Sequence, residues 1–189
     1  KNSDIITFHT PLVKAGEHPT YKMLNPNKMD VMNRSALLIN ASRGGVVDEY
    51  ALKVANYNPK NIIFDVFENE PNIDSNLAEK LFLATPHIAG HSVEGKLRGT
   101  LNMIQGLEIY LGKRIDKILI INELNKTQKT NLNEISYFKL FNKLKERISL
   151  EETSNNFKKL LLNFNYSKFN KMRIEYPKHN ETLSDKSFQ

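Results

Sequence analysis

An arginine, a glutamate and a histidine each follow a run of apolar residues in the first half of this sequence. Arg43 lies in Asn40-Ala-Ser-Arg-Gly-Gly, Glu70 in Asp65-Val-Phe-Glu-Asn-Glu-Pro, and His87 in Thr85-Pro-His-Ile-Ala-Gly. A guanidinium pairs with a carboxylate through two hydrogen bonds and stays charged at any working pH. A histidine exchanges protons near neutrality, and a neighbouring carboxylate stabilises its charged form. The set therefore suits chemistry on a 2-hydroxy acid, in which a carboxylate is held and a hydroxyl proton is removed.

The elements that position these residues read as an alternation of strands and helices. Short apolar runs predict strands over residues 5–10, 36–40, 61–67 and 81–85. They are apolar on both faces, which is typical of parallel strands covered by helices. The fold class expected is α/β, with right-handed crossovers and the second half of a doubly wound parallel, Rossmann-like sheet. Ligands bind beyond the carboxyl ends of such strands, where the arginine, glutamate and histidine all fall.

Three helices have recognisable ends. Asn25 is a plausible N-cap for a short helix that has Pro26 at its first position. Asp48 caps a helix that reaches residue 56. A long amphipathic helix runs from Ser92 to Gly112, with apolar residues three and four positions apart.

Composition narrows the class of protein. With 40% hydrophobic and 25% charged residues the sequence is typical of a globular protein, and it has no apolar run long enough to span a membrane. The absence of cysteine excludes disulfides and thiolate metal sites and fits a cytoplasmic location, and we expect no metal. The net charge of +6 comes mostly from lysines scattered among asparagines, so no nucleic-acid surface and no membrane partner are expected.

The motifs resemble those of the NAD-using D-2-hydroxyacid dehydrogenases. The resemblance is carried by His9-Thr-Pro-Leu, by Leu38-Ile-Asn-Ala-Ser-Arg-Gly, and by the Glu70 and His87 segments given above. Within this family, Gly16-Glu-His-Pro-Thr and Gly90-His-Ser-Val-Glu-Gly are most similar to a branch that acts on a small phosphorylated 2-hydroxy acid. That branch also has a C-terminal dimerisation domain, which Arg173-Ile-Glu-Tyr-Pro resembles. The resemblance implies NAD as the cofactor and a homodimer.

The resemblance also implies a role for each site residue. Arg43 would hold the substrate carboxylate and the reacting C2 oxygen, His87 would be the acid–base group, and Glu70 would be its partner. Glu68 is a rival for the partner role, but the family places the partner directly before the proline. The cofactor contacts implied are Thr10, Ala41, Ser42, Arg43, Asp65 and Gly90. Substrate contacts are Arg43 and His91, which stands where this branch usually has a tyrosine.

The resemblance also implies a domain organisation. Residues 1–90 are expected to form part of an NAD-binding domain, 91–115 a long helix returning to the substrate domain, and 116–189 a C-terminal α/β dimerisation domain. A polar linker is expected over residues 122–134. The apolar residues that fit a dimer interface, or equally an intrachain core, are Phe138, Phe141, Leu144 and Ile148.

One element of a dinucleotide site is missing from this sequence. No Gly-x-Gly-x-x-Gly turn precedes a helix, so we expect the first half of the cofactor domain to lie outside this chain, and the chain alone to bind NAD poorly. Two alternatives stay open. The substrate could be that of a phosphoglycerate or hydroxypyruvate enzyme of the same family, or the chain could be an inactive remnant that acts only through association.

Overall fold

The computed structural model describes residues 2–55, 57–126, 142, 149–163 and 166–177, and the chain divides into two compact units. The first unit comprises Lys1–Ile88 together with Leu150–Glu175. The second comprises Ala89–Ser149 and Tyr176–Gln189. All the predicted site residues except Gly90 and His91 therefore fall in the first unit.

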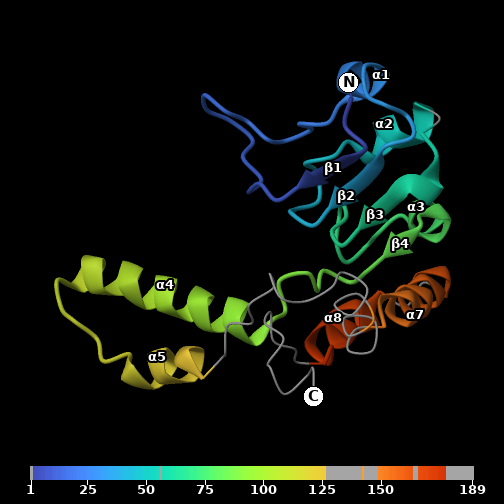
Figure 1. Ribbon diagram of the computed structural model, residues 1–189. Helices are drawn as coiled ribbons and strands as arrows, with labels where there is room; N and C mark the ends of the chain where they lie inside the picture. Colours follow the sequence, from blue (N-terminus) through green and yellow to red (C-terminus); the bar gives the residue numbers. More distant parts are fainter. Residues whose placement is uncertain (1, 56, 127–141, 143–148, 164–165, 178–189) are drawn as a thin grey trace. The chain divides into compact units, whose positions relative to one another are not determined.

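A four-stranded parallel sheet is the centre of the first unit (Figure 1). Its strands, in spatial order, are β1 (Ile5–Phe8), β2 (Leu37–Asn40), β3 (Ile62–Phe64) and β4 (Leu83–Ala84). The connections contain α1 (Pro26–Asp30), α2 (Glu49–Val54), the 3-10 helix η1 (Pro59–Asn61) and α3 (Ser75–Lys80). Strands that follow one another in this order form one half of a doubly wound sheet. The predicted α/β fold class is confirmed.

The two faces of the sheet are buried to different degrees. Leu38 and its register partner Ile62 are fully buried, as is Phe64. On the opposite face Ile39 and Ile63 are only half-buried. Right-handed crossovers between consecutive strands place the connecting helices on the same face, so that face alone receives their apolar side chains. Both faces carry apolar residues, as expected, but those of the second face are only partly buried.

Side-chain caps define where the helices begin. The Asn25 carboxamide accepts a hydrogen bond from the Lys28 amide at 3.2 Å, and the Asp48 carboxylate accepts one from the Ala51 amide at 3.1 Å. Both caps were predicted and both are confirmed. Helix α3 was not predicted, although Asp74 caps it in the same way.

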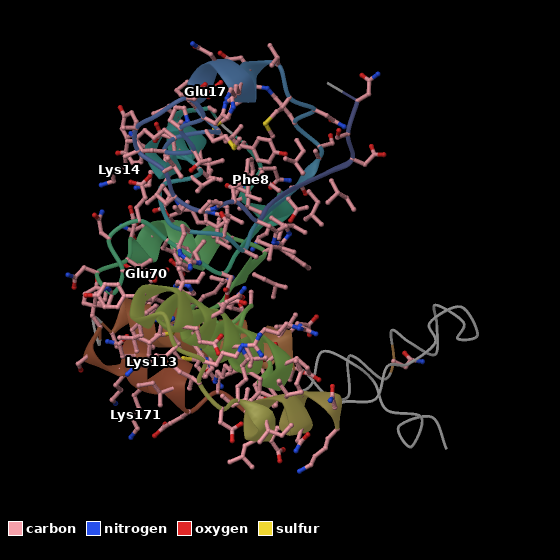
Figure 2. All side chains as sticks on the ribbon, turned by 90° about the vertical axis from the view of Figure 1, so that its left-hand side faces the viewer. Phe8, Lys14, Glu17, Glu70, Lys113 and Lys171 are labelled. Carbon is pink, nitrogen blue, oxygen red and sulfur yellow. The ribbon has the colours of Figure 1, made fainter. Side chains whose placement is uncertain are left out.

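The long loop between β1 and α1 is closed by Thr20. Its hydroxyl donates to the Pro11 carbonyl at 2.5 Å and accepts from the Val13 amide at 2.7 Å. Lys14 and Glu17 lie between these residues, and both are exposed (Figure 2). The threonine of the Gly16-Glu-His-Pro-Thr motif therefore shapes this loop.

Two helices from the end of the chain complete the first unit. Helix α7 (Leu150–Leu162) packs against β4 and α3, and α8 (Ser167–Ile174) packs against α7. The Ser154 hydroxyl accepts from the Ala84 amide at 3.0 Å, and Lys158 donates to the Leu81 carbonyl at 2.6 Å. Phe157 is fully buried, with its ring centroid 6.1 Å from that of Phe67. The C-terminal region thus supplies part of the core around the sheet.

This arrangement differs from the predicted organisation of the tail. Residues 150–175 were expected to belong with the rest of 116–189, whereas the structure groups them with the sheet. The dimerisation role stays a prediction, and the four residues offered for an interface lie outside the described residues.

The second unit contains α4 (Val93–Leu111) and α5 (Ile118–Asn125). Ser92 caps α4 by accepting from the Gly95 amide at 2.9 Å, and Gly112 ends it with a left-handed φ of +63°, as predicted. The Glu108 carboxylate accepts from the Ile115 amide at 2.9 Å and pairs with Lys117 at 2.7 Å, so it ties the two helices together. The predicted linker is wrong for residues 122–125, which are helical. None of the described helices is long and apolar enough to cross a membrane.

Candidate active site

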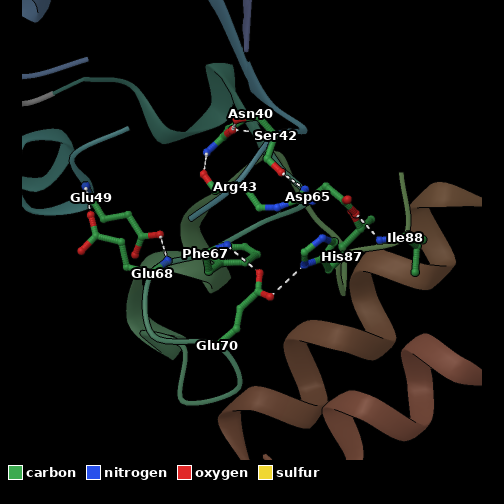
Figure 3. A network of polar contacts seen from close by, with 11 residues as sticks. Asn40, Ser42, Arg43, Glu49, Asp65, Phe67, Glu68, Glu70, His87 and Ile88 are labelled. Atoms are coloured by element: carbon green, nitrogen blue, oxygen red, sulfur yellow. Dashed lines mark hydrogen bonds and ion pairs between the residues drawn. The ribbon is translucent and has the colours of Figure 1, made fainter. Parts of the chain in front are cut away.

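The predicted site residues of the first unit gather at one edge of the sheet. Thr10 follows β1, Arg43 follows β2, Asp65 follows β3 directly, and His87 follows β4. All four strands are parallel, so these segments leave the sheet at the same edge. Figure 3 shows the polar contacts around Arg43, Asp65 and His87, together with the loop that contains Glu70. The predicted arginine, glutamate and histidine belong to one compact unit.

Glu70, and not Glu68, faces the histidine. The His87 Nδ1 atom lies 2.9 Å from Glu70 Oε2, and both side chains are about one-fifth exposed, at 21% and 19%. The second oxygen, Oε1, accepts a hydrogen bond from the Phe67 amide at 2.9 Å. An ionised carboxylate can only accept, so Nδ1 carries the proton in this contact. The opposite ring nitrogen, Nε2, is then the atom that can take a proton from a substrate.

The histidine backbone has an unusual conformation. His87 has a φ of +56°, in the left-handed region that few residues other than glycine adopt. Its amide donates to the Asp65 carbonyl at 2.8 Å and lies 3.0 Å from the Thr85 carbonyl. Backbone conformations of this kind cost about 1–3 kcal/mol and cluster at functional sites. The loop therefore holds the imidazole in one particular direction.

Asp65 fixes this loop on both sides of the histidine. Its Oδ1 accepts from the Thr85 hydroxyl at 2.6 Å and from the Ile88 amide at 2.8 Å, and the residue is 5% exposed. A buried carboxylate that accepts several hydrogen bonds is a strong anchor. Its predicted contact with the nicotinamide end of a cofactor stays a prediction.

Asn40 shapes the turn that carries Arg43. Its side-chain oxygen accepts from the Ser42 amide at 3.2 Å and from the Ser42 hydroxyl at 2.7 Å. Its side-chain nitrogen donates to the Arg43 carbonyl at 3.3 Å. The Ala41 amide donates to the Phe8 carbonyl at 3.3 Å, which ties the turn to β1. The Arg43 side chain is exposed and donates one hydrogen bond to the Ser42 carbonyl at 2.6 Å.

Gly44 lets the arginine turn approach the loop that carries Glu70. A Cβ atom added at Gly44 would lie 1.9 Å from the Phe67 carbonyl oxygen, a distance that no side chain can occupy. Gly45 has a φ of +84°, which glycine adopts without strain. Gly44 thus allows the close approach of the two segments, and Gly45 allows the sharp turn.

The surroundings of the Thr10 hydroxyl fit a hydrogen-bonding ligand. Its hydroxyl is buried and has no hydrogen-bond partner among the residues that the structure describes. A buried polar atom without a partner costs free energy, so a bound group that supplies one is favoured there. Gly90 and His91 belong to the second unit, and their predicted roles stay predictions.

Two polar residues of this network were missed in the sequence. Asn40 could have been found, because asparagine followed two residues later by serine is typical of a side-chain-closed turn. Glu49 could not, because its partner Glu68 lies in a loop after the next strand. The pKa of Glu49 is raised to about 7, mainly by burial; the hydrogen bond from the Glu68 N–H opposes this rise and the nearby Glu68 charge adds to it.

Other possible sites are less informative. A cavity of about 420 Å³ lies beside α2 and α3, away from these site residues. Its lining includes Leu52, Lys53, Tyr57, Ile62, Asp74 and Lys80. Within the described ranges, no group of three or more histidine, cysteine, aspartate or glutamate side chains could hold a metal ion.

Comparison with known proteins identifies the class. Residues 1–89 match the sequence model described as "D-isomer specific 2-hydroxyacid dehydrogenase, NAD binding domain". The matched segment, somewhat less than half of the chain, is similar to the NAD-binding domain of that family.

Several curated proteins that are similar to the chain share one name. The chain is 39% identical, over 82% of its length, to an erythronate-4-phosphate dehydrogenase of Ruthia magnifica subsp. Calyptogena magnifica, of which it covers 47%. It is 45% identical, over 64% of its length, to the enzyme of that name from Psychrobacter sp. (strain PRwf-1), of which it covers 33%. The chain thus spans about half or less of these relatives.

Among solved structures, the chain is similar to the NAD complex of a D-isomer specific 2-hydroxyacid dehydrogenase from Lactobacillus delbrueckii ssp. bulgaricus. The TM-score is 0.43 and the identity 26%, and the match covers 59% of this chain and 38% of that one.

Proposed function

We propose that the whole protein containing this chain oxidises 4-phospho-D-erythronate to (R)-3-hydroxy-2-oxo-4-phosphobutanoate with NAD. This is a step in the synthesis of pyridoxal 5'-phosphate. The observation that carries the proposal is the contact between His87 and Glu70 at the sheet edge that also carries Arg43. The shared name of the relatives supports the particular substrate.

The proposed reaction removes a proton from the C2 hydroxyl group and a hydride from C2 itself. Arg43, with its exposed guanidinium, binds the substrate carboxylate and the C2 oxygen. His87 Nε2 accepts the proton of the C2 hydroxyl, and Glu70 stabilises the imidazolium that results. A bound nicotinamide would supply the acceptor for the hydride that leaves C2 as the C–O single bond becomes a double bond. In the reverse direction His87 returns the proton to the oxygen.

Several residues of this chain are suited to hold the cofactor. The buried Thr10 hydroxyl offers an unsatisfied hydrogen-bonding group at the end of β1. The backbone of Ala41 to Arg43 and the carboxylate of Asp65 lie at the same edge of the sheet. The sequence has no glycine-rich turn for the pyrophosphate, and we expect this chain alone to bind NAD weakly.

The assembly proposed is a homodimer formed through the C-terminal region. We also propose a cytoplasmic location, which the absence of cysteine fits. Size-exclusion chromatography with light scattering tests the assembly: twice the chain mass is expected, and a monomer at micromolar concentration would contradict it.

The substrate is tested by NADH formation with the longest natural protein that contains this chain. We expect a higher kcat/KM for 4-phospho-D-erythronate than for 3-phosphoglycerate. Preference for 3-phosphoglycerate would keep the mechanism and discard the substrate. Turnover of no 2-hydroxy acid would favour the alternative of an inactive chain that acts only through association.

A further inference from the structure

The side-chain carboxylates of Glu49 and Glu68 each approach the backbone amide of the other residue. The Glu68 amide donates to Glu49 Oε1 at 2.6 Å, and the Glu49 amide lies 3.4 Å from Glu68 Oε1 (Figure 3). Glu49 is the first residue of α2, in the segment that begins with Arg43. Glu68 lies in the loop that carries Glu70. The hydrogen bond from the Glu68 amide to Glu49 therefore joins the segment that carries Arg43 to the loop that carries Glu70.

The burial of Glu49 is unusual for a residue at the start of a helix. It is 7% exposed, and the charged groups around it are Glu68, Lys53 and Asp74. Lys53 is itself paired with Asp74, so its charge is shared. A glutamate that only favoured the helix N-terminus could remain in water. A buried carboxyl is costly, and its Oε1 is directed at an amide of another segment.

The amide that Glu49 binds is next to the one that binds Glu70. Phe67 N–H donates to Glu70 Oε1 at 2.9 Å, and the following amide, Glu68 N–H, donates to Glu49. The Phe67 carbonyl, between these two amides, is also the group against which Gly44 packs. This peptide is therefore held from the side of Arg43 by a hydrogen bond and by close packing.

We propose that Glu49 is a positioning residue, which fixes the Phe67–Glu70 loop so that Glu70 stays in contact with His87 Nδ1. Its link to catalysis rests on the function proposed above, but its effect on the histidine does not. Without the Glu49 contact the loop has one anchor fewer, and Glu70 moves away from the imidazole. The ring then loses the acceptor that keeps its proton on Nδ1.

The tautomer of His87 tests this inference without substrate or cofactor. Long-range ¹H–¹⁵N spectra of this chain at pH 8 distinguish Nδ1–H from Nε2–H, and His87→Gln assigns the signal. We expect the Nδ1–H form in the wild type and a roughly tenfold lower ratio of Nδ1–H to Nε2–H in Glu49→Ala, as for one lost hydrogen bond to a charged group. Glu49→Gln keeps an acceptor oxygen and retains the wild-type ratio. Glu79→Ala, an exposed glutamate on α3, is the control.

A second variant covers the case in which Glu49→Ala does not fold. Glu49→Asp keeps the charge at the helix start but is one methylene too short to reach the Glu68 amide, so it shifts the tautomer as Glu49→Ala does. A wild-type ratio in whichever of the two variants folds would overturn the inference. This test measures no turnover, so a protein that oxidises no 2-hydroxy acid can still pass it. A failure of the proposed function is therefore distinguishable from a failure of the positioning role of Glu49.

Discussion

The His87 Nδ1 and Glu70 Oε2 atoms lie 2.9 Å apart, although 17 positions and helix α3 separate the two residues in the sequence. The contact leaves Nε2 as the ring nitrogen for a substrate and gives the imidazolium a negative neighbour. The proposed reaction therefore depends on the negative charge of Glu70, which stabilises the imidazolium that forms when His87 takes the proton.

Replacing Glu70 by glutamine removes this charge with little change in size. We expect kcat for the 2-hydroxy acid to fall about 100-fold or more, because the imidazolium loses its stabilising partner. Steady-state NADH formation measures the effect. Glu79→Gln removes an exposed glutamate of α3 and is the matched control. Equal loss in the two variants would show that Glu70 has no special role.

Gly44 and Gly106 respond to the same substitution in opposite directions. Gly44→Ala places a methyl group on the Phe67 carbonyl and is expected to lower the free energy of unfolding by about 1–3 kcal/mol. Gly106 lies inside α4, and a Cβ atom added there would meet nothing within 4 Å, so Gly106→Ala raises it by about 0.5–1 kcal/mol. Urea denaturation of both variants checks the signs. A Gly44→Ala variant as stable as the wild type would contradict the close approach.

The charge of Glu49 makes stability depend on pH. Its pKa is raised to about 7 in the folded chain, mainly by burial, from an ordinary value of 4.5. The folded chain therefore binds more protons than the unfolded chain between these pH values, and stability falls as pH rises through this window. Above pH 7 the penalty reaches about 3 kcal/mol.

Glu49→Gln removes this titration. We expect the difference in unfolding free energy, variant minus wild type, to increase from pH 5 to pH 8 in urea denaturation. Glu151→Gln, at an exposed position in the first turn of α7, is the control and shows no such increase. The same difference at both pH values would contradict the raised pKa.

Phe157 tests whether the C-terminal helix belongs to the core of the sheet. It is fully buried between Phe67 and Phe169, so Phe157→Ala is expected to cost about 3–5 kcal/mol of unfolding free energy. Phe82→Ala, at a phenylalanine that is 52% exposed, costs about 1 kcal/mol or less. Equal, small losses in both variants would mean that α7 does not support the sheet.

The parts of the fold that local patterns define could be predicted from the sequence. Asn25 and Asp48 were recognised as caps because a cap depends on a residue and the next three amides. The strands were recognised from apolar runs, and their order along the chain placed the site residues at one edge. Helix α3 was missed despite its Asp74 cap, because its six residues form too short an apolar pattern.

The contacts between distant segments could not be predicted. Phe157 packs on Phe67 across 90 positions of sequence. The amphipathic pattern of its helix indicates an apolar face but does not indicate that β4 is the element it packs against. The Glu49 contact with Glu68 is also long-range, and a glutamate after an N-cap is ordinary on a helix surface. Motifs identified the residues with chemistry, whereas the residues that position them depend on tertiary packing.

The most direct test of the proposed site is the formation of NADH from 4-phospho-D-erythronate by the longest natural protein containing this chain, compared with its His87→Gln variant. The account predicts turnover by the wild type and a kcat lower by about 10²- to 10⁴-fold in the variant, the usual contribution of a general acid–base group. Wild-type turnover that His87→Gln leaves unchanged would contradict the assignment of His87 as the acid–base group.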